Sequence, residues 1–185
     1  MELLAVEALI QQRRTSLRVD PDRAVPLDLV ERLVHLVGWA PNHKRTWPWR
    51  TTVVTGEGRR RLGELVATYE QGRGADDARV EKARRKYLRA PVVLLFGRAA
   101  HPDPVRCAED RDAVAAGIQN LLLAATAAGL ASHWATGEWM SAPTVKAFAG
   151  LDHEDELVAL VYLGWPNGDV PPVDRPPVPI AYVQA

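Results

Sequence analysis

Trp39-Ala-Pro-Asn-His-Lys-Arg-Thr-Trp-Pro-Trp49 is the stretch around which this 185-residue sequence is organised, because it sets three tryptophans and two prolines around a polar run. Each proline fixes its own φ and moves the preceding residue out of the α region. Ala40-Pro41 is therefore expected to end a helix, and Trp47-Pro48 to begin an extended segment. The result is a stiff loop, whose polar groups beside aromatic rings suit a planar ligand with polar edges. A tryptophan-rich corner of the core is the alternative interpretation.

The sequence on either side of this loop predicts a helix before it and a strand after it. Residues 26–39 carry a wide apolar stripe with a proline in the first turn, which is typical of an amphipathic helix. Residues 49–55 include a Thr-Thr-Val-Val run typical of a strand, and Gly56-Glu57-Gly58 predicts a turn into a helix that begins near Arg59. The charged sequence that follows is expected to be helical, with a break near Gly72.

The composition favours one domain, residues 1–185, in a reducing compartment. An apolar fraction of 47% is enough for a substantial core at this length. Acidic and basic residues number 23 each, which argues against a nucleic-acid footprint or a polybasic membrane face. Cys107 is the single cysteine, so no internal disulfide framework is encoded. The sequence has no basic leader and no uninterrupted apolar run of about 18 residues, and we expect a cytoplasmic protein that neither enters membranes nor binds nucleic acid.

Further apolar segments predict strands in the second half of the chain. Residues 90–97 and 156–164 are apolar without alternation, as in strands that are covered on both faces. A shorter strand is expected after Gly129. Beyond Pro166 the sequence becomes rich in proline, so about residues 166–185 are expected to form an extended C-terminal arm.

Residues 108–128 predict the longest helix, after a loop at residues 99–107 that is rich in Pro, Asp and His. The helix is apolar almost all the way round, so it must be buried on all sides. One chain of this size can hardly cover it, and its small residues would let a helix of a second subunit approach closely. Central burial within one chain is the alternative. His101 and Asp103 in the loop lack further ligands at a suitable spacing, so no metal site is expected.

A basic segment, Arg13-Arg14-Thr15-Ser16-Leu17-Arg18, comes at the end of a short amphipathic helix predicted for residues 2–13. Guanidinium groups give bidentate, charge-assisted hydrogen bonds to phosphate, and the two hydroxyls can complete the shell around its oxygens. The segment could therefore hold one phosphate monoester. A solvated helix end, stabilised by the helix dipole, is the alternative.

A second candidate ligand segment is Trp134-Ala135-Thr136-Gly137, which comes at the end of the strand expected after Gly129. It combines a flat ring, a small residue, a hydroxyl and a glycine that allows the backbone to approach a ligand closely. Such a segment can lie along a planar heterocycle while backbone groups meet its polar edge. A tryptophan of the core is the alternative.

These segments, in this order, resemble the FMN-dependent nitroreductases, and in particular the short, single-domain branch of that family. Each motif alone is permissive, and the resemblance depends on their collinearity over nearly the whole chain. No glycine-rich phosphate loop of the P-loop or Rossmann type occurs in the sequence. The matching segments are Arg13-Arg14-Thr15, residues 40–49, residues 56–59, Ala90-Pro91, residues 134–137 and residues 163–166.

The resemblance implies an α+β, nitroreductase-like fold, with a central, mostly antiparallel sheet flanked by helices and the long buried helix at a homodimer interface. FMN is the implied cofactor, bound at the interface between subunits. Arg13, Arg14 and Thr15 would hold its phosphate, ribityl chain and ring edge, and Arg175 would complete the phosphate site. The residues implied to line the ring or the pocket are Asn42 and His43, from the opposite subunit, and Trp134, Ala135, Thr136 and Gly137.

The implied activity is that of an NAD(P)H-dependent oxidoreductase, which passes hydride from NADH or NADPH through flavin N5 to a flat acceptor such as a nitroaromatic or a quinone in a ping-pong cycle. No catalytic side chain is implied, because the flavin carries the chemistry. Lys82 or Lys86 could reach the ring, and the sequence does not choose between them. A flavin-binding carrier or redox sensor without turnover would share every cofactor motif and is the alternative function.

Overall fold

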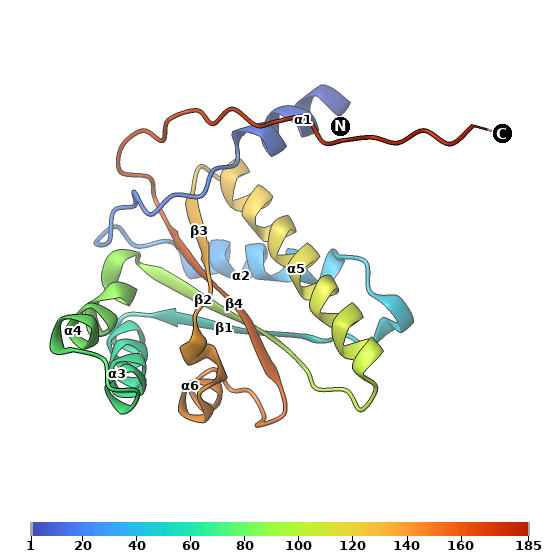
Figure 1. The fold of residues 1–185 in the computed structure, drawn as a ribbon. Helices are drawn as coiled ribbons and strands as arrows, with labels where there is room; N and C mark the ends of the chain where they lie inside the picture. The colour runs from blue at the N-terminus through green and yellow to red at the C-terminus, as the bar shows by residue number, and fades with distance from the viewer. Residues whose placement is uncertain (1, 185) are drawn as a thin grey trace.

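A four-stranded antiparallel sheet in the order β1-β2-β4-β3 lies at the centre of the computed structural model, which describes residues 2–184 (Figure 1). The strands are β1 (Trp49–Thr55), β2 (Val92–Arg98), β3 (Ala131–Ala135) and β4 (Glu156–Gly164). The α-helices of the described residues are α1 (Leu3–Gln12), α2 (Leu27–His35), α3 (Glu57–Gly72), α4 (Asp77–Arg85), α5 (Pro104–Ala127) and α6 (Pro143–Phe148). Short 3-10 helices are η1 (Leu36–Trp39), η2 (His43–Arg45), η3 (Lys86–Arg89) and η4 (Glu138–Ser141). The expected α+β fold with a central antiparallel sheet is confirmed.

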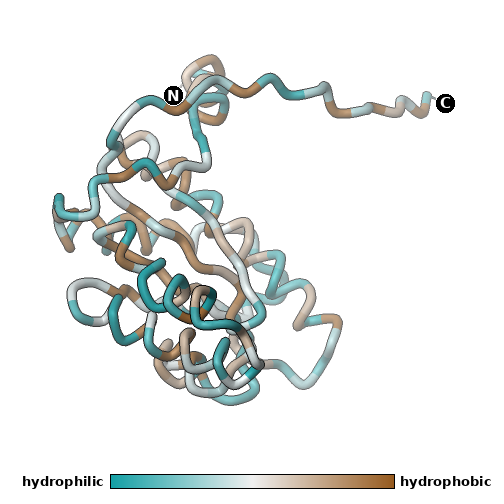
Figure 2. The backbone as a smooth tube through the Cα atoms, turned by 60° about the vertical axis from the view of Figure 1, so that its left-hand side comes forward, coloured by the Kyte–Doolittle hydropathy of each residue, from teal (hydrophilic) through white to brown (hydrophobic). Residues whose placement is uncertain are grey.

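The two central strands are buried on both faces. Every residue of β2 is buried, and β4 is buried from its second residue onward. Val93 and Leu95 belong to a core shared with α3 and α6, whereas Leu94 and Phe96 belong to a core shared with α2 and α5. Because alternate side chains of a strand point to opposite faces, one unbroken apolar run contributes to both cores. Figure 2 shows these strands as an apolar interior beside largely polar outer helices.

Several boundaries follow the sequence closely. β1 and β4 occupy the residues expected for them, 49–55 and 156–164. The predicted stop at Ala40-Pro41 is confirmed, because η1 ends at Trp39 and Ala40 is extended. The helical break near Gly72 is confirmed as well, since α3 ends there and α4 begins five residues later.

Helix α3 begins slightly earlier than predicted, at Glu57 rather than near Arg59. Gly56 has a φ of 50°, in the left-handed region that glycine enters at little cost, and it turns the chain directly from β1 into the helix. The predicted three-residue turn is therefore reduced to one residue.

Helix α5 begins at Pro104 rather than at residue 108, so the loop expected at residues 99–107 is shorter than predicted. Proline is favoured in the first turn of a helix, where its missing N–H would have no intrahelical partner. The Asp103 carboxylate caps the helix by accepting a hydrogen bond of 2.9 Å from the backbone N–H of Val105.

Within this chain, helix α5 is covered on one side only. Ile118 and Leu121 are fully buried in the core formed with α2 and the sheet, whereas Asp112 and Ala116 are exposed. Gly117 lets η1 approach closely, since a Cβ atom there would lie 2.5 Å from the carbonyl oxygen of Val37. The helix that was expected to be buried on all sides thus keeps one face that its own chain leaves open.

Helix α1 and the C-terminal arm lie at the surface. No residue of α1 is buried, and Leu3 and Leu4 are 71% and 74% exposed. Residues 167–184 form neither helix nor strand and run past α1 as an extended arm (Figure 1). Among residues 2–184, no helix is both long and apolar enough to cross a membrane.

Candidate functional site

The basic segment after α1 runs along the free edge of β3. The backbone N–H of Ser16 donates a hydrogen bond of 2.8 Å to the carbonyl oxygen of Ser132, and Thr15 forms a parallel bridge with the same residue. Main-chain pairing therefore fixes the position of Arg13, Arg14 and Thr15 relative to the sheet. The structure brings these three predicted residues together at the start of β3.

Arg175 of the C-terminal arm joins this group of guanidiniums. The pKa of Arg13 is lowered, first by partial burial and then by the positive charges of Arg175 and Arg14. Among residues 2–184, none of these three side chains forms an ion pair with a carboxylate. Arg13 lies 3.5 Å from the Thr15 hydroxyl, and Arg14 donates to backbone carbonyls of its own segment. Like charges gathered without a counter-ion favour the binding of an anion.

The other end of β3 opens onto a cavity of about 680 Å³, which is lined in part by Thr136, Gly137, Glu138, Tyr69 and Arg111. The backbone at Gly137 is extended and carries no side chain, so a ligand can approach it closely. β3 rises about 3.3 Å per residue, which places this cavity roughly 15 Å from the guanidinium group. An elongated ligand with an anionic end and a flat end can span both.

Trp134 was predicted to lie along the ligand. Its side chain lies on the face of the sheet that is covered by α2 and α5. Its register partner in β4 is Val161, and its ring packs against the core that contains α2 and α5. Ala135 points to the opposite face, toward the core with α3 and α6. The predicted segment 134–137 is therefore divided, and only its later part lines the cavity.

The structure separates the two candidate lysines. Lys86 is half-buried, and its ammonium nitrogen lies 5.0 Å from the centre of the Tyr87 ring and 5.4 Å from that of Trp139. Burial lowers the pKa of Lys86, an effect that the negative charge of Glu70 opposes. Lys82 is exposed. Trp139 comes two residues after Gly137, so Lys86 rather than Lys82 lies near this segment, whereas Lys146 is a lysine that lines the cavity itself.

Two residues that the sequence did not single out, His133 and Arg89, lie in the same region. His133 is the register partner of Tyr162, and the ring centres are 6.0 Å apart. Burial, followed by the charge of Arg89, lowers the pKa of His133. Burial raises the pKa of Tyr162 to about 12, against the opposing effect of Arg89. These residues are distant in the sequence and meet only through strand pairing, so no spacing signal reveals them.

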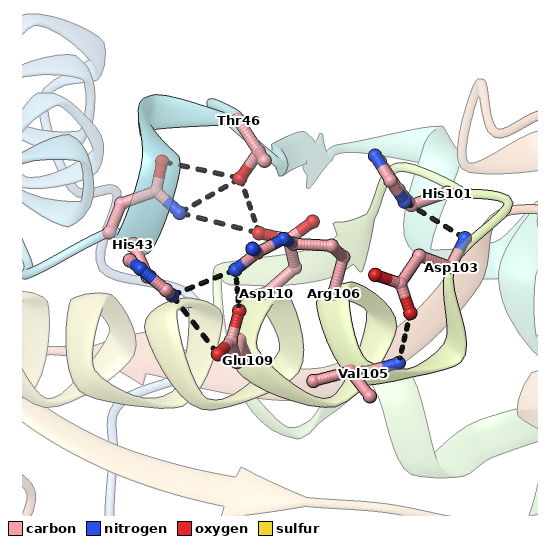
Figure 3. A network of polar contacts seen from close by, with 9 residues as sticks. His43, Thr46, His101, Asp103, Val105, Arg106, Glu109 and Asp110 are labelled. Atoms are coloured by element: carbon pink, nitrogen blue, oxygen red, sulfur yellow. Dashed lines mark hydrogen bonds and ion pairs between the residues drawn. The ribbon is translucent and has the colours of Figure 1, made fainter.

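The proline-flanked loop lies at the start of α5, where Figure 3 shows its polar contacts. The side-chain amide of Asn42 donates to the Thr46 hydroxyl (2.9 Å) and to the Asp110 carboxylate (3.3 Å), and its oxygen accepts the backbone N–H of Trp47 (2.9 Å). The Thr46 hydroxyl also donates to Asp110. The Asn42 side chain, predicted to face a ligand, is thus engaged in holding the loop to α5.

His43 projects from the loop toward two charged residues of α5. Its Nδ1 atom lies 3.0 Å from a carboxylate oxygen of Glu109 and 2.8 Å from a guanidinium nitrogen of Arg106. A single ring nitrogen can donate to Glu109 or accept from Arg106, so the tautomer of His43 decides between the partners. The hydrogen bond from His43 is the main cause of the lowered pKa of Glu109, and Arg106 adds to it.

The backbone of this loop is strained. Lys44, Arg45 and Trp47 have positive φ values of 61°, 54° and 52°. Non-glycine residues in this region cost on the order of 1–3 kcal/mol each, and such residues gather at functional sites. The hydrogen bonds from the loop to α5 are the contacts that offset this cost.

The loop lies beside the first half of α5, whereas the chain segment that follows α1 lies near the other end of α5 (Figure 1). The 24 residues of α5 extend about 36 Å at 1.5 Å per residue. One chain therefore brings Arg13, Arg14, Thr15 and Arg175 together with β3, but it does not bring Asn42 and His43 to them.

The sequence and the fold of this chain are similar to those of known proteins. A model of the nitroreductase family matches residues 10–165. YdjA of Escherichia coli, which carries a provisional name as an NAD(P)H nitroreductase, is 28% identical over 164 residues that cover 88% of both chains. A crystal structure of a nitroreductase-like protein from Bacillus cereus superposes with a TM-score of 0.83 at 27% identity, over 96% of this chain and 94% of the other. A provisionally named nitroreductase from Desulfovibrio desulfuricans, solved in complex with FMN, gives a TM-score of 0.69 at 27% identity, over 92% and 91% of the two chains.

Proposed function

The chain belongs to the nitroreductase family, and from this premise we propose that it binds FMN along β3 and oxidises NADH or NADPH with a flat acceptor such as a nitroaromatic or a quinone. FMN, when bound, would supply the hydride transfer at N5 that links the nicotinamide to the acceptor in a ping-pong cycle. The relatives support this assignment through the name of YdjA and the FMN in the Desulfovibrio desulfuricans structure. The chain itself supplies binding, orientation and charge.

The phosphate of FMN is assigned to the guanidinium group at the start of β3. Arg13, Arg14 and Arg175 gather there without a carboxylate partner among the described residues, and the Thr15 hydroxyl lies beside Arg13. Guanidinium groups bind phosphate oxygens in pairs of parallel hydrogen bonds, so three of them can satisfy a dianion. This cluster is the observation that carries the proposal.

The ring of FMN is assigned to the far end of β3. Thr136 and Gly137 line the cavity directly after Ala135, and Lys86 holds a positive charge near Trp139, the ring that packs beside Gly137. Trp134 supports the strand from the opposite face of the sheet. A cation near the ring stabilises the negative charge that the flavin gains on reduction.

The remaining pocket residues are assigned to a second copy of the chain. Two antiparallel α5 helices packed through their open faces would bring the start of one helix, with its loop, to the end of the other. Asn42 and His43 would then line the site of the partner, and the homodimer would contain two equivalent sites. Ala116, exposed in the middle of the open face, allows close packing of the two helices.

The flat acceptor is assigned to the space between this loop and the ring. Trp39 and Trp47, at the two ends of the loop, are 82% and 60% exposed. Exposed indole rings favour planar aromatic molecules through stacking. The protein needs no nucleophile or metal for this reaction.

The decisive experiment is to purify the protein, record its visible spectrum, and measure NADH and NADPH oxidation with menadione or nitrofurazone. We expect a yellow protein that contains FMN and turns over with the acceptor. Yellow protein that never oxidises either nucleotide would support the carrier or redox-sensor alternative instead. Folded protein that is colourless and does not bind added FMN would contradict the proposal.

A further inference from the structure

We propose that Asp110 is a positioning residue for the acceptor pocket, because its buried carboxylate holds the loop of residues 42–47 in the strained shape that presents His43 to the flavin of the partner subunit. The inference rests on the proposed function and adds a residue to it. Asp110 touches neither substrate nor cofactor and acts through Asn42 and Thr46.

The first support is the environment of the carboxylate. Asp110 is only 2% exposed, and among residues 2–184 it forms no ion pair. A buried carboxylate without a cation must be compensated by hydrogen bonds. The side-chain donors that reach Asp110 are the Thr46 hydroxyl and the Asn42 amide, both of which belong to the loop. The hydrogen bonds from this loop therefore explain how α5 can carry a buried carboxylate at Asp110.

The second support is the path of these hydrogen bonds across the strained residues (Figure 3). Asn42 lies before Lys44 and Arg45, and Thr46 lies after them, so Asp110 ties together the two ends of the left-handed stretch. The Asn42 oxygen then accepts the backbone N–H of Trp47, the third residue with a positive φ. Asp110, Asn42 and Thr46 are thus hydrogen-bonded to one another, and these bonds hold the loop with positive φ values at Lys44, Arg45 and Trp47.

The third support is what the loop displays. His43 and Trp47 are both exposed, and neither belongs to a core of its own chain. Strain held in place by a buried group, with exposed side chains at its tip, is typical of a site built to meet a ligand rather than to stabilise the fold.

The test compares Asp110→Asn and Thr46→Val with matched controls in the FMN-loaded protein. Asp155→Asn is the control for the carboxylate in the exchange measurement only, because Asp155 also lines the cavity beside Gly137; it is 7% exposed and accepts the backbone N–H groups of Ala100 and Asp152. Thr52→Val is the control for the hydroxyl, which donates to the carbonyl of Ala149 at 2.5 Å. Each control removes a comparable hydrogen bond away from the loop.

Two measurements follow. Hydrogen exchange of residues 42–49 is expected to be about tenfold faster in Asp110→Asn and Thr46→Val, and unchanged in both controls. The KM for the acceptor is expected to rise about tenfold in the two loop variants while kcat changes less than about twofold, whereas Thr52→Val keeps the wild-type KM. If Asp110 only stabilised the fold, its replacement would lower thermal stability without raising KM selectively over kcat.

The outcomes separate the inference from the function on which it rests. Wild-type protein without NAD(P)H oxidation overturns the proposed function and the acceptor role of Asp110 with it. Active wild type, with both loop variants matching their controls in exchange and matching Thr52→Val in KM, overturns the role of Asp110 alone. If Asp110→Asn does not fold, Thr46→Val decides, because it removes only the hydrogen bonds of the Thr46 hydroxyl to Asn42 and Asp110, at a partly exposed residue.

Discussion

The indole nitrogen of Trp139 fills the space beside Gly137, where a Cβ atom at residue 137 would lie only 2.2 Å from it. Trp139 is 3% exposed and cannot move without disturbing the core with α3. Gly137→Ala is therefore expected to destabilise the protein by about 1–3 kcal/mol, the usual cost of overpacking. Thermal unfolding measures the loss, and Gly72→Ala, which meets no atom within 4 Å, is the control. Equal stability of the two variants would contradict the close contact.

Arg13→Gln is expected to weaken FMN binding at least about tenfold, because a hydrogen bond to a charged group contributes about 1.5–3 kcal/mol and 1.4 kcal/mol equals a factor of ten. Titration of the apoprotein, followed by quenching of flavin fluorescence, gives the affinity. Riboflavin, which lacks the phosphate, should bind the variant as well as it binds the wild type. Arg60→Gln, a change at an exposed arginine paired with Glu57, serves as the control. A parallel loss of riboflavin affinity would place Arg13 at the ring instead.

Lys86→Met is expected to lower the flavin reduction potential by about 30 mV, which corresponds to about 1.4 kcal/mol for a two-electron couple. The reason is that a half-buried cation near the ring favours the reduced, more negative flavin. Lys82→Met should leave the potential unchanged, because Lys82 is exposed. Spectroelectrochemical titration of both variants tests the assignment. The opposite pattern would show that Lys82 is the lysine near the flavin.

Ala116→Glu is expected to convert a dimer into a monomer. Ala116 is exposed on the open face of α5, so a single chain tolerates glutamate there, whereas two helices packed through this face would bury its charge. Sedimentation velocity distinguishes a species of one 20.4 kDa chain from one of twice that mass. Ala78→Glu, on the exposed side of α4, should leave the mass in solution unchanged. A dimer that survives Ala116→Glu would place the interface elsewhere.

Stability is expected to fall as the pH drops below about 6.5, the ordinary histidine pKa. The folded protein lowers the pKa of His133, so below that pH the unfolded chain binds a proton that the folded chain resists. The free energy of unfolding therefore rises with pH up to about 6.5. Above that pH, His133 is neutral in both states and its destabilising effect is absent. Urea denaturation from pH 5 to pH 8 measures the slope. His133→Gln should flatten the slope, and an unchanged slope would assign it to other groups.

The sequence predicted the sheet more completely than it predicted the site. β1 and β4 were located to the residue because unbroken or β-branched apolar runs ended at turn residues on both sides. The start of α5 was missed because Pro104 and Asp103 were interpreted as loop residues. In the structure they act as the first turn and the cap of the helix.

From local sequence alone, the candidate site could be predicted where its residues are neighbours in the chain, whereas Arg175 was expected only through the family resemblance. Arg13, Arg14 and Thr15 form one segment, and strand pairing at Ser132 carries them as a unit. Asp110 and His133 gave no signal, because each depends on a contact with a residue brought close by tertiary folding. The choice between Lys82 and Lys86 also required the structure, since only burial and the nearby rings distinguish them.

Strands β2 and β4 build the cores, whereas the candidate ligand groups lie on other segments. This separation has a consequence for protein engineering. The two central strands fill both cores with aliphatic side chains, while the candidate ligand groups sit on peripheral loops, a strand end and an arm. Libraries that randomise the exposed positions 43–45, 138 and 141, and that keep the buried Trp139 and Met140, would therefore sample new acceptor preferences without lowering the stability of the core. In this fold, the residues proposed to set acceptor preference and the residues that stabilise the core occupy different parts of the molecule.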